Sequence, residues 1–174
     1  MTRTRLASAL AVALTLAAAA PMTHAATYNN GTATATFNVT LALQANCTIS
    51  ANPLNFGSNG VLSTALSQQT TVAVTCTNTT PYNIGLDAGT VTGSSVATRL
   101  MAGTSAGNTT TTVSFQLYQD AAHTTVWGNT QGTNTVTGTG TGSAQSIAVY
   151  GQVPVQATPQ PDTYQTTITA TVYF

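Results

Sequence analysis

Residues 34–43 read TATFNVTLAL, and in this stretch large apolar side chains alternate with small or polar ones. Such a period of two is typical of a strand with one apolar face, and the residues that make this face are Phe37, Val39, Leu41 and Leu43. The stretch lies near the start of the sequence and ahead of the first cysteine. We interpret it as a strand that the chain provides to a neighbouring subunit and does not keep for its own sheet.

The first 25 residues have the pattern of a secretory signal peptide. Arg3 and Arg5 supply positive charge, residues 6–20 form an apolar run, and small residues precede a predicted cleavage site before Ala26. The run of about 15 residues is shorter than the roughly 20 that span a bilayer, so we expect secretion and no membrane insertion. We therefore divide the chain into a signal peptide (1–25), a donor-strand segment (26–45) and a main domain (46–174).

After cleavage the chain would carry almost no charge. Its sequence contains no Lys and no Glu, and the remaining charged side chains are Arg99, Asp87, Asp120 and Asp162. A nucleic-acid surface needs clustered basic residues, so this class of partner is excluded. The charges that commonly block edge-to-edge strand pairing are also missing, which suits a protein that packs against copies of itself. A soluble extracellular sandwich is an alternative with the same composition.

The sequence contains two cysteines, Cys47 and Cys76. In a secreted protein an even pair indicates a disulfide. This one would close a loop of about 30 residues, a constraint worth roughly 3–4 kcal/mol in the chain-entropy model. Both cysteines lie in short β-like runs, so we expect the bridge to join two strands.

The main domain is predicted to be all-β, because Thr and Val abound and no stretch keeps a helical period. Strands are expected at residues 47–50, 70–76, 82–87, 112–119, 145–155 and 164–174, with a short one at 99–101 and an ambiguous stretch at 62–66. The Gly/Thr tract at 132–142 is predicted to be a flexible surface loop flanked by short strands. Short strands between regularly spaced turn signals are typical of a β-sandwich.

Groups for catalysis are scarce. His123 is the one histidine after the signal peptide, and a Ser-His-Asp arrangement would have to use it with an aspartate such as Asp120. These two residues belong to one predicted turn, where Asp is favoured for hydrogen bonds to the backbone. With both thiols in a disulfide, too few ligands remain for a metal site. We therefore predict no enzyme, no cofactor and no metal.

The last predicted strand, residues 164–174, runs to the end of the sequence. A seven-strand immunoglobulin-like sandwich needs one more strand beside it, so we expect an open edge and an open apolar groove. Burial of the four large side chains of residues 34–43 is worth about 6–12 kcal/mol, at about 1.5–3 kcal/mol each. Backbone hydrogen bonds along the open edge would add to this. Pairing of the N-terminal strand within its own sheet is the simpler alternative.

The chain resembles the spore coat protein U domain family, which includes the pilins of archaic chaperone–usher pili. The resemblance covers essentially the whole mature chain and includes the alternating segment before Cys47 and the terminal aromatic strand. It also rests on the order and spacing of short motifs: LNFG at 54–57, VTC at 74–76, RL at 99–100, YQDA at 118–121, VWG at 126–128 and VYGQVP at 149–154. Where many relatives carry Gly and Asp around the aromatic residue that begins the last strand, this chain has Asp162 and Thr166.

The resemblance implies an incomplete immunoglobulin-like β-sandwich that lacks its last strand, plus an N-terminal donor strand. A periplasmic chaperone would supply the missing strand until, at an outer-membrane usher, the N-terminal strand of the next subunit replaces it. The implied donor side chains are Phe37, Val39, Leu41 and Leu43. In the implied acceptor groove residues 164–174 form one wall, with Ile168, Ala170, Val172 and Phe174 as its site residues and the Phe174 carboxylate as a chaperone contact. Cys47 and Cys76 would form the family's disulfide.

We therefore expect a structural subunit of a secreted surface pilus, which assembles with copies of itself and related pilins in adhesion and biofilm formation. A self-complemented spore-coat or matrix protein, whose N-terminal strand folds back onto its own groove, is the alternative. A sugar-binding tip module is less favoured. Trp127 is more consistent with a core position than with a sugar platform, and a single domain leaves no room for a receptor-binding domain.

Overall fold

The computed structural model describes residues 30–174, so the predicted signal peptide lies outside the described residues. The chain divides into two units at the boundary between Thr40 and Leu41. Residues 30–46 form no helix and no strand. The alternating segment 34–43 thus pairs with no strand of residues 30–174, and its pairing in a neighbour stays a prediction.

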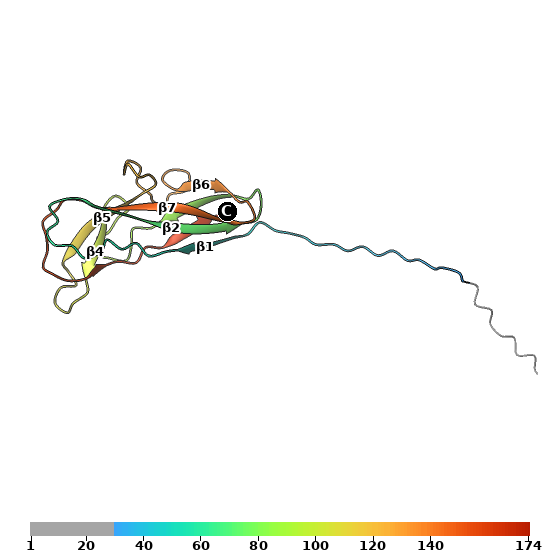
Figure 1. Ribbon diagram of the computed structural model, residues 1–174, viewed down its shortest axis with the longest axis horizontal. Helices are drawn as coiled ribbons and strands as arrows, with labels where there is room; N and C mark the ends of the chain where they lie inside the picture. Colours follow the sequence, from blue (N-terminus) through green and yellow to red (C-terminus); the bar gives the residue numbers. More distant parts are fainter. Residues whose placement is uncertain (1–29) are drawn as a thin grey trace, which may run out of the picture. The chain divides into compact units, whose positions relative to one another are not determined.

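The larger unit is all-β, as predicted, and its strands form two sheets (Figure 1). The six-stranded sheet has the order β1-β2-β7-β5-β4-β8, and the three-stranded sheet has the order β6-β3-β9. The strands are β1 (Cys47–Ala51), β2 (Leu66–Cys76), β3 (Pro81–Leu86), β4 (Arg99–Gly103), β5 (Thr112–Tyr118), β6 (Val136–Thr139), β7 (Ala144–Val153), β8 (Tyr164–Gln165) and β9 (Ala170–Tyr173).

The core lies between the two sheets and follows the alternation of their strands. β3 buries Tyr82, Ile84 and Leu86 from the small sheet, and β2 buries Val72 and Val74 from the large one. β5 and β7 add the remaining large side chains from the large sheet: Val113, Phe115, Leu117, Val149 and Val153. All pairings between strands are antiparallel.

The strand order is that of an immunoglobulin-like sandwich with one position empty. In that fold one sheet contains strands A, B, E and D, and the other contains C, F and G. β1, β2, β7 and β5 occupy the first four places, while β3 and β9 occupy C and F. No strand among residues 30–174 occupies the place of G beside β9, so β9 is an edge strand. The predicted incomplete sandwich is confirmed.

The prediction of one continuous strand at residues 164–174 is wrong. β8 pairs with β4 in the large sheet, whereas β9 pairs with β3 in the small sheet. The intervening residues leave the ladder because side chains bind their backbone: Thr169 N donates to Asp87 Oδ1 at 2.9 Å and Thr167 N to Thr90 Oγ1 at 3.4 Å. The terminal run therefore crosses from one sheet to the other.

The prediction that residues 132–142 form a loop flanked by strands is also wrong in part, because β6 lies inside this tract and pairs with β3. The pairing depends on a residue without a side chain. The ring of Tyr82 covers Gly138, and a Cβ at that glycine would overlap the ring. The Gly/Thr composition thus serves close packing in a short edge strand and not flexibility alone.

Candidate functional site

An open apolar groove of about 500 Å³ lies where the edges of the two sheets approach each other. One wall is the chain from Ala51 to Phe56, and the other is the chain from Tyr164 to Ala170. The floor consists of core side chains: Val72, Leu86, Met101, Phe115, Leu117 and Val149. The groove lies entirely within the larger unit.

The first wall continues β1 after its pairing with β2 ends. Asn52 N donates to Thr71 O at 3.0 Å, and the following Pro53 has no N–H to donate. Leu54 and Phe56 then lie half-buried along the groove. Their side chains rest above Gly151 of β7, because a Cβ there would overlap Leu54 and lie 3.1 Å from Phe56 Cζ. The wall therefore depends on a glycine of β7 that lies beneath it.

The second wall has free backbone groups. Asp87 N donates to Thr169 O at 3.1 Å, so the backbone groups of Thr169 and of every second residue after it point toward β3. Backbone groups of alternate residues in an antiparallel strand point to opposite sides. Those of Ile168, Ala170 and Val172 therefore point away from β3, toward the open side of the sheet. This edge is a template for one more strand.

β1 presents a matching edge. Asn46 O accepts from Thr77 N at 2.9 Å, so the phase of the β1–β2 ladder directs the backbone groups of Cys47, Ile49 and Ala51 away from β2. β1 and β9 approach each other to within 8 Å between Cα atoms, which is closer than the roughly 10 Å that a strand inserted between them would need. The space for an added strand is therefore the groove beyond this approach. There it would meet the free backbone groups of Ala51 on one side and those of Ile168 and Ala170 on the other, with the apolar floor beneath it.

A buried arginine supports the floor. Arg99 is fully buried, and its guanidinium donates to the carbonyl oxygens of Asp87 (2.8 Å), Leu86 (2.9 Å) and Trp127 (2.6 Å) and to Gln116 Oε1. Burial lowers the pKa of Arg99 to about 10, and the negative charge of Asp87 opposes this shift. The same Asp87 carboxylate binds Thr169 N, so this network joins the floor to the second wall.

A second network fixes the end of that wall at Tyr164. Asn108 Nδ2 donates to Asp162 Oδ2 at 2.6 Å and to the Tyr164 hydroxyl at 3.2 Å. Ser105 binds the same carboxylate through its backbone N–H and its hydroxyl. These hydrogen bonds, from Asn108 first and then Ser105, hold the pKa of Asp162 well below its usual value. The departure from the family pattern at Asp162 therefore ties the β4–β5 hairpin to the groove.

The structure separates the four residues predicted for the acceptor wall. Ile168 and Ala170 line the groove. Val172 and Phe174 lie instead at a second hollow of about 470 Å³, together with Pro81, Asn83, Gln131 and Tyr173. Tyr164, which begins the predicted wall, also lines the groove. Sequence reasoning missed Leu54 and Phe56. Both belong to the LNFG motif, whose position after the first strand was the available signal.

Among the described residues, the four predicted donor side chains are almost fully exposed. The exposed fractions are 85% for Phe37, 84% for Val39 and 82% for both leucines, Leu41 and Leu43. Single exposed apolar residues are common on proteins, but a periodic row of large ones marks an interaction site. Exposure of this row is compatible with a donor strand and does not by itself assign the partner.

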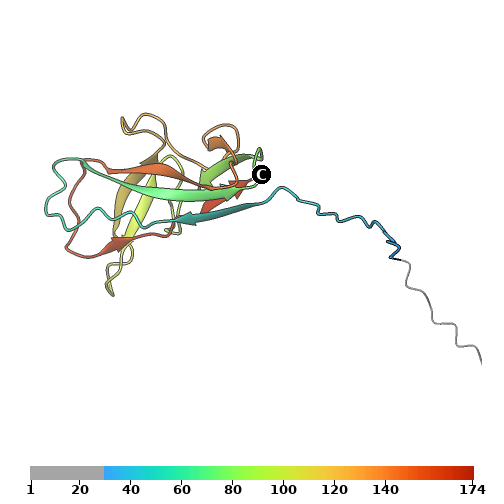
Figure 2. The ribbon, with the colours of Figure 1, turned by 45° about the vertical axis from the view of Figure 1, so that its right-hand side comes forward.

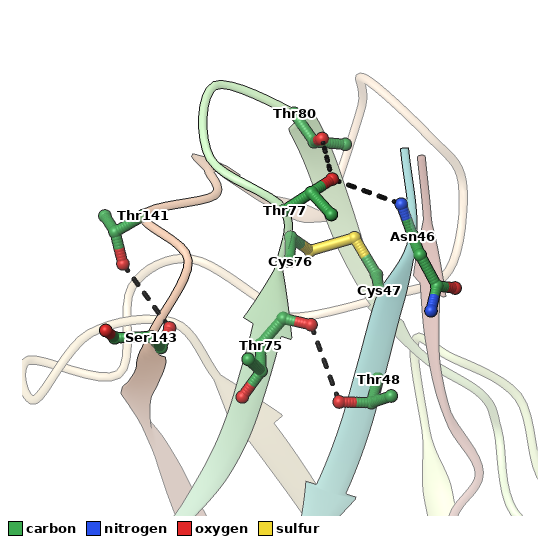
Figure 3. The surroundings of a disulfide bond; sticks show 9 residues. All are labelled: Asn46, Cys47, Thr48, Thr75, Cys76, Thr77, Thr80, Thr141 and Ser143. Carbon is green, nitrogen blue, oxygen red and sulfur yellow. Dashed lines mark hydrogen bonds between the residues drawn. A yellow bond between two sulfur atoms is a disulfide. The ribbon is translucent and has the colours of Figure 1, made fainter. Parts of the chain in front are cut away.

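The predicted disulfide is confirmed. Cys47 and Cys76 are bonded, with their Cα atoms 4.1 Å apart, and they join the start of β1 to the end of β2 (Figure 3). Beside the bridge, Asn46 N donates to Thr77 Oγ1 at 3.2 Å (Figure 3). The residues that precede β1 are thereby fixed to the domain up to Asn46.

The two side chains considered for other chemistry have structural roles. Trp127 is fully buried and its indole N–H donates to Ile84 O at 2.8 Å, so it is a core residue as predicted. Asp120 accepts hydrogen bonds from Thr124 and Thr125 within its turn, and His123 packs edge-on against Tyr118. Within residues 30–174 there is no cluster of three metal-ligating side chains, and no helix long and apolar enough to cross a membrane.

The family model described as Spore Coat Protein U domain matches residues 33–171. Among solved structures, the chain is similar to one from Acinetobacter baumannii, described as the CsuC-CsuE chaperone-tip adhesion subunit pre-assembly complex from archaic chaperone-usher Csu pili. The TM-score is 0.54 at 21% identity, over 76% of this chain and 40% of that chain.

The chain thus spans less than half the length of that solved chain, and at this identity the likeness shows a shared fold. No curated protein matches the sequence at a significant level. The family model, in contrast, covers most of the sequence, including the alternating segment, both groove walls and both cysteines. The chain belongs to the Spore Coat Protein U domain family.

Proposed function

We propose that the chain is a structural subunit of a surface pilus that assembles by donor-strand exchange, in which residues 34–43 of one copy fill the groove of the next. The observation that carries this proposal is that one chain contains both a groove and a segment suited to fill it. The domain has an open apolar groove between two free strand edges, and the chain carries an exposed apolar row with strand periodicity. Family membership and the fold shared with a pilus tip subunit support it.

The donor row and the groove are equal in length. Residues 37–43 and residues 164–170 are stretches of the same size, and each spans about 20 Å as an extended strand at about 3.3 Å per residue. Antiparallel pairing of these stretches puts Phe37 opposite Ala170 and Leu43 opposite Tyr164. The small side chain of Ala170 then leaves space for the largest donor side chain.

The direction of the added strand favours exchange between copies. β1 runs away from the end of the sandwich that holds the C-terminus, whereas β9 runs toward it (Figures 1 and 2). Only Gln44, Ala45 and Asn46 separate Leu43 from β1, so a strand folded back in cis would form a hairpin with β1 and lie parallel to β9. A strand from another copy is free to lie antiparallel to β9, as the G strand of an antiparallel sheet does.

The open groove also implies that other proteins protect the subunit during secretion. An uncovered apolar groove with unpaired edges promotes aggregation, so the subunit needs a temporary strand before it polymerises. A periplasmic chaperone that provides this strand, with the Phe174 carboxylate as one contact, and an outer-membrane usher that exchanges it meet this need. The assembled pilus would stand on the cell surface and act in adhesion and biofilm formation.

A truncated chain and a peptide test the proposal. The mature chain without residues 26–43 should be unstable alone, and a peptide of residues 31–43 should raise its melting temperature in a saturable way. A matched control peptide with Leu41→Asp should give no shift, because it places a charge over the apolar floor. A truncated chain that folds unaided and ignores the peptide would contradict donor-strand exchange.

The second candidate function is a self-complemented coat or matrix protein. The short connection before β1 favours it, because three residues are sufficient for a hairpin. Such a protein would run as a stable monomer in size-exclusion chromatography. A ladder of multimers in unheated samples on denaturing electrophoresis would exclude this candidate.

A further inference from the structure

Three large apolar side chains of the sandwich itself are strongly exposed. They are Val61 at 76%, Val155 at 62% and Phe174 at 59%. Val61 and Val155 lie on two neighbouring loops, which are joined by hydrogen bonds from Gln156 N to Leu62 O at 3.2 Å and from Leu62 N to Thr158 Oγ1 at 2.8 Å. We name this end of the sandwich, residues 57–65 and 154–163, the loop pole.

Phe174 lies at the opposite end. The C-terminus, the start of β1 and the end of β2 gather there in both views (Figures 1 and 2). Gly142 N donates to Cys76 O at 3.0 Å and Thr79 N to Gly140 O at 2.8 Å, which packs two loops around the disulfide. We name this end, which comprises Cys47, Cys76, residues 77–80 and 140–143 and Phe174, the disulfide pole.

The connection between the donor row and its own sandwich is very short. Asn46 is held by Thr77 on both its N–H and its carbonyl, so only Gln44 and Ala45 are free between Leu43 and the domain. Consecutive Cα atoms in an extended chain advance at most about 3.6 Å. The disulfide pole of the copy that provides the strand must therefore lie within about 11 Å of the donor's Leu43.

In the antiparallel arrangement proposed above, Leu43 sits beside Tyr164, at the loop pole of the accepting copy. We propose that the loop pole of each copy packs against the disulfide pole of the copy whose strand it holds, with Val61 and Val155 at the centre of the contact. This inference rests on the proposed function. It is a head-to-tail interface, and such an interface propagates into a filament when it does not close into a ring.

The chemistry of the two poles suits this contact. The loop pole contributes two exposed valines, and the disulfide pole contributes Phe174 and uncharged Thr, Asn, Gly and Ser side chains. The one charged side chain of the two poles is Asp162 of the loop pole, whose carboxylate is bound by Asn108 and Ser105. The approach of the poles therefore buries apolar surface without placing two charged side chains of the same sign against each other.

Cross-linking of full-length fibres tests the contact. Fibres made from the Val155→Cys, Asn78→Cys double variant, treated with a short bis-maleimide, should give a covalent ladder after boiling in detergent. The matched control, Ser146→Cys with Asn78→Cys, places the first thiol at an exposed position near the start of β7, away from the loop pole, and should give no ladder between copies. Insertion of Gly-Ser-Gly-Ser between Gln44 and Ala45 should weaken the first ladder several-fold while fibres still form.

Each outcome bears on the inference. If the Val155–Asn78 ladder is no stronger than the control ladder, the contact between the loop pole and the disulfide pole is overturned. Donor-strand exchange is not affected by that result. A ladder that is unchanged by the insertion overturns the claim that the short connection imposes the contact. If neither the variants nor the unsubstituted chain forms fibres that bury residues 34–43, the proposed function fails and this inference fails with it.

Discussion

The guanidinium of Arg99 donates to the backbone carbonyl of Trp127 at 2.6 Å, and both side chains are completely buried. Among the described residues no carboxylate forms an ion pair with this arginine; it is satisfied by carbonyl oxygens and by Gln116. A buried charge with this many hydrogen bonds fixes the positions of several segments at once. Here those segments are the end of β3, the middle of β5 and the chain after Val126, which surround the groove floor.

Replacement of Arg99 should therefore be costly. Arg99→Met fills much of the volume but leaves the carbonyl oxygens of Leu86, Asp87 and Trp127 buried without donors, a loss on the order of 3–5 kcal/mol. Urea unfolding of the chain bound to the donor peptide measures this loss. Thr98→Ala, at the exposed neighbouring position, is the control and should change the midpoint little. A Met variant as stable as the control would show that the network contributes nothing.

Gly151→Ala should reduce binding of the donor strand more than it reduces folding. The new methyl group overlaps Leu54 and crowds Phe56, so the first wall must move into or away from the groove. We expect the affinity for a peptide of residues 31–43 to fall at least tenfold, as measured by the concentration dependence of the melting temperature. Gly60→Ala is the control, because a Cβ there has no atom within 4 Å. Equal affinities in the two variants would refute the importance of this contact.

Acid should weaken the fold through two carboxylates. Hydrogen bonds lower the pKa of Asp162, and hydrogen bonds from Thr124 and Thr125 lower that of Asp120 although desolvation opposes the shift. A lowered folded pKa gives stability that is present above the unfolded value of 3.8 and is lost as the pH falls toward the folded pKa. The urea midpoint should thus fall from about pH 5 downward.

Asp162→Asn isolates the larger of these contributions. The variant should be less stable than the wild type at pH 7, and its urea midpoint should change less between about pH 5 and pH 3. The sequence has only three Asp and Glu residues in total, so few other groups contribute to this slope. Identical slopes in the two proteins would mean that Asp162 does not couple protonation to stability.

The local sequence pattern predicted those elements whose signal lies in their own residues. Alternation located β5 to within one residue, and the count of cysteines identified the disulfide. The empty place beside β9 followed from counting strands against the immunoglobulin order. In each case the signal was present in the residues that form the feature.

The features that sequence reasoning missed depend on residues distant in the chain. The break before β9 is made by Asp87 and Thr90, about eighty positions earlier. β6 exists because Tyr82 can lie over Gly138, and the first groove wall exists because Gly151 leaves room for Leu54. A glycine in a repetitive tract and a glycine under a groove look alike in sequence, and only the packing distinguishes them.

The direction of the added strand decides between exchange and self-complementation. A copy of residues 31–43 placed after Phe174 on a short Gly/Ser turn would form a hairpin with β9 and run antiparallel to it. With the native residues 26–43 deleted, this chain should be monomeric, and its melting temperature should exceed that of the unmodified monomer by on the order of 10 °C or more. The gain is expected because four large side chains become buried over the open floor. The same construction with Leu41→Asp in the added copy is the control and should lose the gain. An unmodified chain that is already monomeric and as stable as the rearranged one would mean that the strand folds back in cis.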